Sequence, residues 1–206
     1  MYDKLGLRDK KRIATAHALA EAAFELALEH GMDGFVVDDI VQRAGYSKRT
    51  FANYFSCKEE AVVTAAVTAE SDRQEYDDLV AGLPEDTSPL DILYHLLQMQ
   101  LAAEILHKVR RLVSLSKSHP ELEPYILSVF RGLQDSAQAV LEEFSGGRYP
   151  EGYTHLLAGA AYGAFVPILD GSLNVLLPGE TENGDSRAVT FDQYVDFTFN
   201  YLRNGF

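Results

Sequence analysis

The chain has 206 residues, 47% of them hydrophobic, and a formal net charge of −13 at pH 7. This length can bury a sizeable core, in one large or two small domains. No apolar run reaches membrane-spanning length, and the amino terminus lacks the apolar stretch of a secretion signal, so we expect a cytoplasmic protein. A single cysteine, Cys57, excludes a disulfide within the chain.

The negative charge is unevenly distributed along the chain. Up to Lys58 there are nine Lys or Arg against eight Asp or Glu, whereas from Glu59 onward nine basic residues stand against twenty-three acidic ones. Residues 4–12 hold five basic side chains and one acid, a cationic arm suited to follow phosphates. Since the acidic remainder would repel DNA, a nucleic acid would dock at the amino-terminal end alone.

The first predicted element is a long helix over residues 9–30, where apolar residues recur at helical spacing and Gly31 follows as a stop. Two short helices joined by a tight turn are predicted within residues 35–55. A fourth helix is predicted over residues 59–80. The first sixty residues thus hold three helices before the chain continues into a fourth.

A loop at residues 82–89 precedes the second part of the chain. Ser88 is placed to cap the next helix, with Pro89 at its first position. The strongly apolar helix predicted over residues 90–116 belongs at the centre of a bundle. Three more helices are predicted, over residues 121–144, 151–170 and 189–203. No strand alternation, repeat or low-complexity tract is found, so the fold class expected is all-α.

The two short helices and their turn carry most of the functional information. Gly45 tolerates the positive φ that the turn needs. Apolar residues mark one face of the first helix and the underside of the second: Ile40, Val41, Ala44, Phe51 and Phe55. The outward residues of the second helix are then mostly hydrogen-bond donors: Ser47, Lys48, Arg49, Thr50, Asn53 and Tyr54.

A helix with such donors fits the DNA major groove. Ser47 is the predicted N-cap, Arg49 and Asn53 are of types that read base edges, and Lys58 could hold the phosphate backbone from the next helix. The alternative is a helix-turn-helix that serves packing alone. The coincidence of exposed donors with a basic arm in an acidic chain favours DNA binding.

These residues resemble the TetR family of bacterial transcriptional regulators in order and spacing. The resemblance rests on the helix over residues 12–31, Val37-Asp-Asp-Ile40, Ala44-Gly-Tyr-Ser-Lys48, Phe51-x-x-Tyr-Phe55 and Lys58-Glu59. It implies a helix-turn-helix domain at residues 1–57 and a helical-bundle domain for ligand binding and dimerisation at residues 58–206. It further implies a homodimer that binds a palindromic operator and releases it when a small, largely apolar effector binds.

Two positions depart from the family pattern. Many members carry Thr at the position of Val36 and an aromatic residue at the position of Ala52, and both positions commonly touch DNA. We therefore carry neither contact over, and the operator sequence stays open.

The resemblance implies an effector pocket in the second domain but does not show which residues line it. Candidate lining residues are aromatic or amphipathic: Tyr94, Gln98, Met99, His107, Tyr125, Phe130, Tyr162 and Phe165. Any one of them could instead be ordinary core, because aromatic residues at helical spacing normally fill a bundle.

A stripe of small residues on the helix predicted at 151–170 permits close helix packing. The resemblance implies that this helix and the last one form the dimer interface, with candidates Gly159, Gly163, Phe191, Tyr194, Phe197, Thr198 and Tyr201. A tight contact within one subunit is the alternative.

Two other classes of function stay open. Glu104 and His107 have the Glu-x-x-His spacing of di-iron helical bundles, but no second such motif accompanies them. Cys57 at a predicted helix start could act in a redox sensor. We expect no catalytic residue, no metal site and no cofactor.

Overall fold

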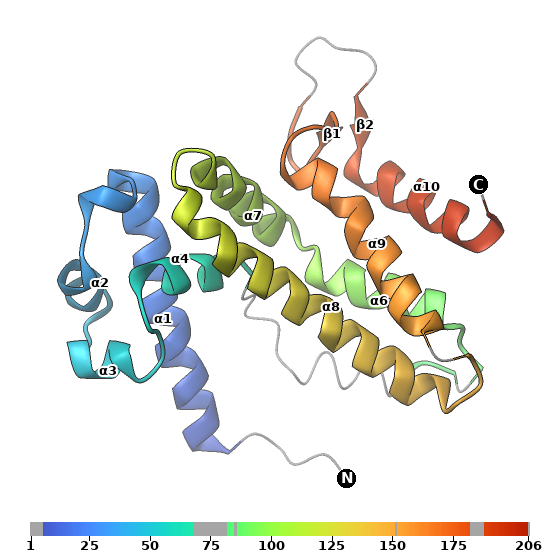
Figure 1. The fold of residues 1–206 in the computed structure, drawn as a ribbon, viewed down its shortest axis with the longest axis horizontal. Helices are drawn as coiled ribbons and strands as arrows, with labels where there is room; N and C mark the ends of the chain where they lie inside the picture. The colour runs from blue at the N-terminus through green and yellow to red at the C-terminus, as the bar shows by residue number, and fades with distance from the viewer. Residues whose placement is uncertain (1–5, 68–81, 85, 151, 182–187, 206) are drawn as a thin grey trace. The chain divides into compact units, whose positions relative to one another are not determined.

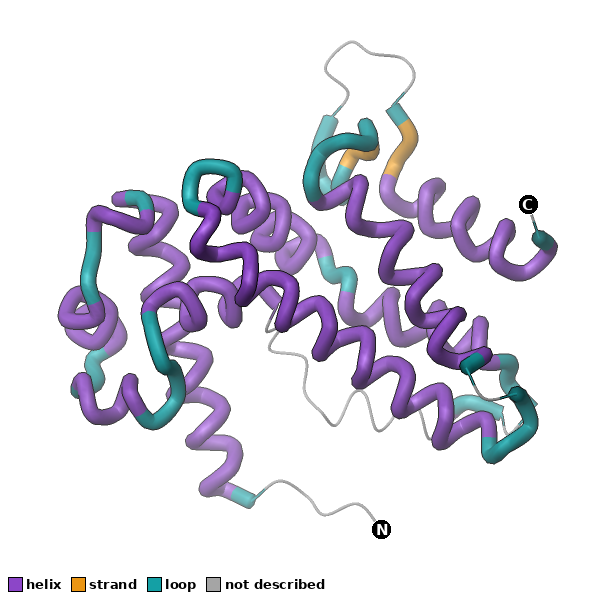
Figure 2. The backbone as a smooth tube through the Cα atoms, viewed as in Figure 1, coloured by secondary structure: helices purple, strands orange, loops and turns teal. Residues whose placement is uncertain are grey.

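The computed structural model describes residues 6–67, 82–84, 86–150, 152–181 and 188–205. In this part the chain is built of α-helices with one pair of very short strands, which confirms the all-α prediction (Figures 1 and 2). The chain divides into two compact units, one of Met1–Thr68 with Ser114–Val129, the other of Ala69–Val113 with Phe130–Phe206. Each unit is described separately below.

The core of the first unit lies between α1 (Leu7–His30) and α4 (Lys58–Val67). Alanines let the two helices approach closely, and Ala20, Ala23, Ala27, Ala61 and Ala65 are buried. As predicted, α1 ends where Gly31 donates its N–H to the Ala27 carbonyl. Because α1 begins at Leu7, the described part of the basic arm forms its exposed first turns.

The helix-turn-helix consists of α2 (Val37–Ala44) and α3 (Lys48–Ala52), preceded by the short 3-10 helix η1 (Met32–Gly34). Gly45 has φ of 74°, which confirms the prediction of positive φ at the turn. Of the apolar residues predicted to face inward, Ile40, Val41, Phe51 and Phe55 are buried and Ala44 is half-buried. The Phe51 and Phe55 rings lie 5.5 Å apart and hold α3 against the unit's core.

The second unit contains most of the remaining helices. These are α6 (Pro89–Gln100), α7 (Ala103–Ser116), α8 (Glu123–Ser145), α9 (Tyr153–Leu169) and α10 (Phe191–Asn204), while the 3-10 helix η2 (Pro120–Leu122) precedes α8. The last residues of α7, 114–116, and the first residues of α8, 123–129, belong to the first unit. Ser88 caps α6 through its bond to the Asp91 N–H, with Pro89 in the first turn, as predicted.

The two strands β1 (Val175–Leu176) and β2 (Val189–Thr190) pair in parallel, with Val175 opposite Val189. The sequence predicted no strand, because a two-residue strand is too short to show alternation. The pairing sets the loop after β1 beside the start of α10. Thr190 then caps α10 through the Gln193 N–H.

One predicted helix is wrong in its length. The sequence predicted a single helix over residues 90–116, whereas α6 ends at Gln100 and α7 starts at Ala103. Leu101 turns the chain with φ of −94° and ψ of 37°. No Gly or Pro marks this break in the sequence. Residues 68–80 of the predicted fourth helix lie outside the described residues.

Candidate functional site

The surface formed by α2, the turn and α3 is organised by helix caps. The Ser47 hydroxyl accepts from the Thr50 N–H at 3.1 Å and lies 2.9 Å from the Thr50 hydroxyl, which confirms Ser47 as the N-cap of α3. At the start of α2 the Asp39 carboxylate accepts from the Val36 N–H at 2.8 Å. The Val36 side chain has no atom that could accept in return, so only half of a capping box forms.

Two basic residues of this surface are paired with acids of the same unit. Lys48 Nζ lies 2.7 Å from Asp38 Oδ1, and both side chains are largely exposed. Arg43 on α2 donates two hydrogen bonds to Glu29 on α1, at 3.0 and 2.6 Å. These bonds lower the pKa of Glu29 and raise that of Arg43, so both groups stay charged at neutral pH. Arg43 therefore fixes α2 on α1.

Arg49 and Asn53 are two exposed polar residues of this surface for which the described part of the chain shows no side-chain hydrogen bond or ion pair. Both lie in the exposed class, Arg49 on α3 and Asn53 at its C-cap. In the described part of the chain no acid forms an ion pair with Arg49, in contrast to Lys48 and Arg43. Asn53 and Tyr54 follow the end of α3 at Ala52, so they lie on the turn after it and not within it.

Lys58 has a structural role that the sequence did not reveal. Its Nζ donates to the backbone carbonyls of Met32 and of Phe35, at 3.0 Å for the latter, and lies 4.9 Å from the centre of the Phe35 ring. The ammonium thus ties the start of α4 to η1 and the segment before α2. A contact of Lys58 with DNA stays a prediction.

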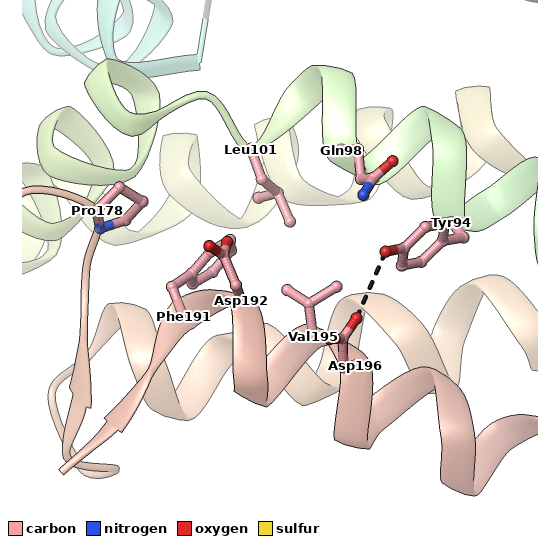
Figure 3. Close-up of a pocket in the computed structure, with 8 residues that line it drawn as sticks. All are labelled: Tyr94, Gln98, Leu101, Pro178, Phe191, Asp192, Val195 and Asp196. Atoms are coloured by element: carbon pink, nitrogen blue, oxygen red, sulfur yellow. Dashed lines mark hydrogen bonds between the residues drawn. The ribbon is translucent and has the colours of Figure 1, made fainter.

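The second unit contains a pocket between α6 and α10, shown in Figure 3. Its volume is about 360 Å³. The residues that line it are Tyr94, Gln98 and Leu101 on the α6 side, Phe191, Asp192, Val195 and Asp196 on α10, and Pro178 from the loop after β1. The Tyr94 hydroxyl lies 3.5 Å from an Asp196 carboxylate oxygen.

The pocket takes in two of the eight residues predicted to bind a ligand, Tyr94 and Gln98. His107 lies beside it, where its Nε2 contacts the Pro178 carbonyl at 3.0 Å. Phe165 is buried against Phe191, with ring centres 6.0 Å apart. The other predicted lining residues do not join this pocket: Tyr162 and Phe130 are half-buried on α9 and α8, and nothing is described of the Met99 side chain.

Tyr125 belongs to the first unit, whereas the pocket residues belong to the second. The Cys57 thiol donates to the Tyr125 hydroxyl at 3.2 Å, and this bond raises the pKa of Tyr125. The Cys57 sulfur also accepts from the Glu60 N–H at 3.4 Å, at the start of α4. Cys57 therefore acts as a helix cap.

The pocket residues that sequence reasoning missed are Leu101, Pro178, Asp192, Val195 and Asp196. The sequence carried one usable signal, since Asp192 and Asp196 are four residues apart and so share a helix face. Pro178 could not be found from its neighbours in the chain, because only the β1–β2 pairing sets its loop near α10.

A second, shallower groove of about 450 Å³ runs along α9 and α10. Ala160, Ala164, Tyr194, Phe197, Thr198, Tyr201 and Leu202 line it. It includes four of the seven residues predicted for the dimer interface. Of the other three, Phe191 is buried. Gly159 packs near α8, since a Cβ added to it would lie 3.3 Å from the Gln134 side-chain nitrogen. Gly163 is exposed, and a Cβ added to it would meet no atom within 4 Å.

The residues considered for an enzyme do not converge in the structure. Glu104 pairs with Lys108 at 3.1 Å, one turn along α7, while His107 contacts Pro178. Among the described residues no group of three or more His, Cys, Asp or Glu side chains is arranged to hold a metal ion. None of the helices in that part of the chain is long and apolar enough to cross a membrane.

The capped helix-turn-helix with its exposed donors, joined to a helical bundle, defines a DNA-binding regulator. Residues 19–63 match the family described as "Bacterial regulatory proteins, tetR family". The "Putative mycofactocin biosynthesis transcriptional regulator MftR" of Mycobacterium tuberculosis (strain ATCC 25618 / H37Rv) is 26% identical over 168 residues, which cover 76% of this chain and 80% of that protein.

A similar fold occurs in the crystal structure of "a putative TetR-family transcriptional regulator" from Mesorhizobium loti MAFF303099. That match has a TM-score of 0.52 and 17% identity, and it covers 93% of this chain and 96% of the other. Together the match of residues 19–63 and the similarity to a curated regulator support a transcriptional regulator of the TetR family.

Proposed function

We propose that the protein is a repressor that binds a palindromic operator as a homodimer and leaves it when a small, largely apolar effector binds in the second unit. It acts by binding alone, without catalysis, in the cytoplasm. The observation that carries the proposal is the capped α3, which presents Arg49 and Asn53 uncommitted beside the turn. The predicted DNA contacts are Ser47, Lys48, Arg49, Thr50, Asn53, Tyr54 and Lys58.

The local contacts support different roles for these residues. Arg49 and Asn53 are free to read base edges, since a guanidinium pairs with guanine and a carboxamide with adenine. The Ser47 and Thr50 hydroxyls are engaged in the cap, so their part is to set the orientation of α3. Lys48 must leave Asp38 or share it to reach a phosphate.

Dimerisation through α9 and α10 is supported by large apolar side chains that stay exposed in the described chain. On α10 the Phe197 and Tyr201 side chains are 55% and 51% exposed and lie on a different face from the buried Phe191 and Val195, whereas the half-buried Tyr194 beside them donates its hydroxyl to the Ala164 carbonyl. On α9 the Leu156 side chain is 71% exposed. A second copy that pairs α9 and α10 with the same helices would cover both stripes in a two-fold symmetric bundle.

The DNA-binding proposal is tested with DNA from the protein's own gene neighbourhood. Arg49→Ala is expected to weaken specific binding by about 5- to 150-fold, the equivalent of losing one bidentate base contact of about 1–3 kcal/mol. Arg131→Ala on α8, which removes another exposed cation, is the matched control. Fluorescence anisotropy over a salt series would overturn the proposal if wild type showed no specific, salt-dependent binding or if both variants behaved alike.

The dimer proposal has its own matched pair of variants. Gly163→Leu on α9 enters open space within one subunit, so it should leave the fold intact but disrupt the dimer. Gly132→Leu on α8 is also an exposed helical glycine with open space and should leave the dimer unchanged. Sedimentation velocity would refute the interface if Gly163→Leu remained dimeric, or if wild type were a monomer.

A further inference from the structure

We propose that the pocket between α6 and α10 binds a small organic cation with an apolar body. Such a cation would be the effector of the regulator, a role that rests on the proposed function. The inference concerns the charge of the ligand, because the lining residues of Figure 3 combine apolar walls with carboxylates and include no basic side chain.

The walls of the pocket favour an apolar or aromatic body. Phe191 and Val195 are buried by their own unit and present their remaining surface to the pocket from α10. Leu101 faces them from the end of α6, and Pro178 closes one end (Figure 3). A volume of about 360 Å³ lies at the lower end of the range for small-molecule sites, which suits a ligand of one or two rings.

The polar groups of the pocket favour a positive charge. Asp192 and Asp196 lie one helical turn apart and both line the pocket. In the residues that the structure describes, neither carboxylate forms an ion pair. Of the basic groups nearby, Arg203 pairs with Asp91 and His107 contacts the Pro178 carbonyl, while His95, whose ring centre is 5.8 Å from that of Tyr94, does not line the pocket.

Tyr94 adds a neutral aromatic face at the carboxylate end. Burial raises its pKa, and the charges of Asp196 and Asp192 raise it further, so the hydroxyl stays protonated at neutral pH. Its bond to Asp196 is long, at 3.5 Å, which leaves that carboxylate open to a stronger donor. An ammonium or amidinium group could bond Asp196 while it packs over the Tyr94 ring.

Other ligand charges fit this pocket less well. An anion would face two carboxylates with no cation beside it. A Ca²⁺ or Mg²⁺ ion prefers six or more oxygen ligands, whereas two carboxylates, one amide and one phenol share this pocket with four apolar side chains. A neutral apolar molecule would gain no bond from the exposed Asp192 and Asp196 carboxylates and would partly cover them with apolar surface.

The test uses three probes of one shape and different charge, namely benzamidine, benzamide and benzoate. Titrations of the full chain followed by ligand-observed NMR should show benzamidine binding at least ten times more tightly than benzamide, with benzoate weakest. The double variant Asp192→Asn with Asp196→Asn should weaken benzamidine about tenfold and leave benzamide unchanged. Asp135→Asn, an exposed aspartate on α8, is the control that should change neither.

Equal binding of the three probes, no binding of any, or benzamidine binding that survives the double substitution would each refute the inference. Because these titrations contain no DNA, their outcome is independent of whether the protein binds an operator. If benzamidine binds as expected but leaves the affinity for DNA unchanged, the cation site stands and only its role as effector site fails.

Discussion

If Lys48 holds a DNA phosphate as proposed, its ion pair with Asp38 competes with that contact. Lys48 must give up or share Asp38 before it can hold a phosphate, and the two atoms are 2.7 Å apart. Asp38→Asn removes the competing charge and keeps the shape of the side chain. We expect this variant to bind DNA more tightly than wild type.

The size of the effect follows from the exposure of the pair. Two unit charges at this distance attract by about 1.5 kcal/mol in bulk water. The Lys48 and Asp38 side chains are 64% and 60% exposed, so screening and side-chain entropy reduce the net value to about 0.2–1 kcal/mol. Releasing Lys48 should therefore tighten binding by about 1.4- to 5-fold.

A double-mutant cycle separates this release from the general loss of a negative charge near DNA. Anisotropy at fixed salt would compare wild type, Asp38→Asn, Lys48→Ala and the double variant, with Asp135→Asn as a control for the same substitution at an exposed ion pair of α8. The gain from Asp38→Asn should be smaller when Lys48 is absent. An equal gain in both backgrounds would show that Lys48 takes no part, and no gain at all would refute the competition.

Three further predictions concern stability, each measured by urea unfolding. Val36→Thr should stabilise the protein by about 1 kcal/mol, because Thr supplies the missing acceptor at an N-cap whose backbone is already extended; a loss of stability would refute this. Lys58→Met should destabilise it by about 1–3 kcal/mol, since two carbonyls, including that of Phe35, lose their donor; an unchanged midpoint would show that water replaces the ammonium. The Ser88 hydroxyl first, and then Arg203, lower the pKa of Asp91. The ionised Asp91 carboxylate therefore stabilises the fold fully well above its ordinary pKa of 3.8, and this stabilisation is lost as pH falls through the lower pKa of the folded state. The difference in unfolding free energy between wild type and Asp91→Asn should shrink below about pH 4. A difference that stays constant with pH would contradict this.

Local chemistry explains which parts of the fold could be predicted from the sequence. Ser47, Gly45 and Gly31 determine helix ends through bonds to residues close in the chain, so the sequence located the helix-turn-helix and the end of α1. The break at Leu101 has no such marker. Apolar residues continue on most sides of the predicted helix over residues 90–116, so the change from α6 to α7 leaves no trace in the pattern.

The candidate site was harder to predict where partners are distant in the chain. Lys58 was assigned to DNA because of its charge, and nothing near it shows that the Met32 and Phe35 carbonyls lie within its reach. Phe191 was grouped with the exposed residues of α10, yet it packs on Phe165. Aromatic residues on two faces of one helix cannot be assigned to core or surface by residue type.

The contacts of Lys58 have a consequence for how fast the protein finds DNA. Arg43 and Lys48 are each offset by a carboxylate at close range, and their fields largely cancel beyond it. Lys58 is held by neutral carbonyls, so its full charge contributes to the field around the first unit, over a screening length of about 8 Å at physiological salt. A lysine held for structural reasons can thus raise the rate of encounter with a polyanion, whether or not it also contacts that polyanion.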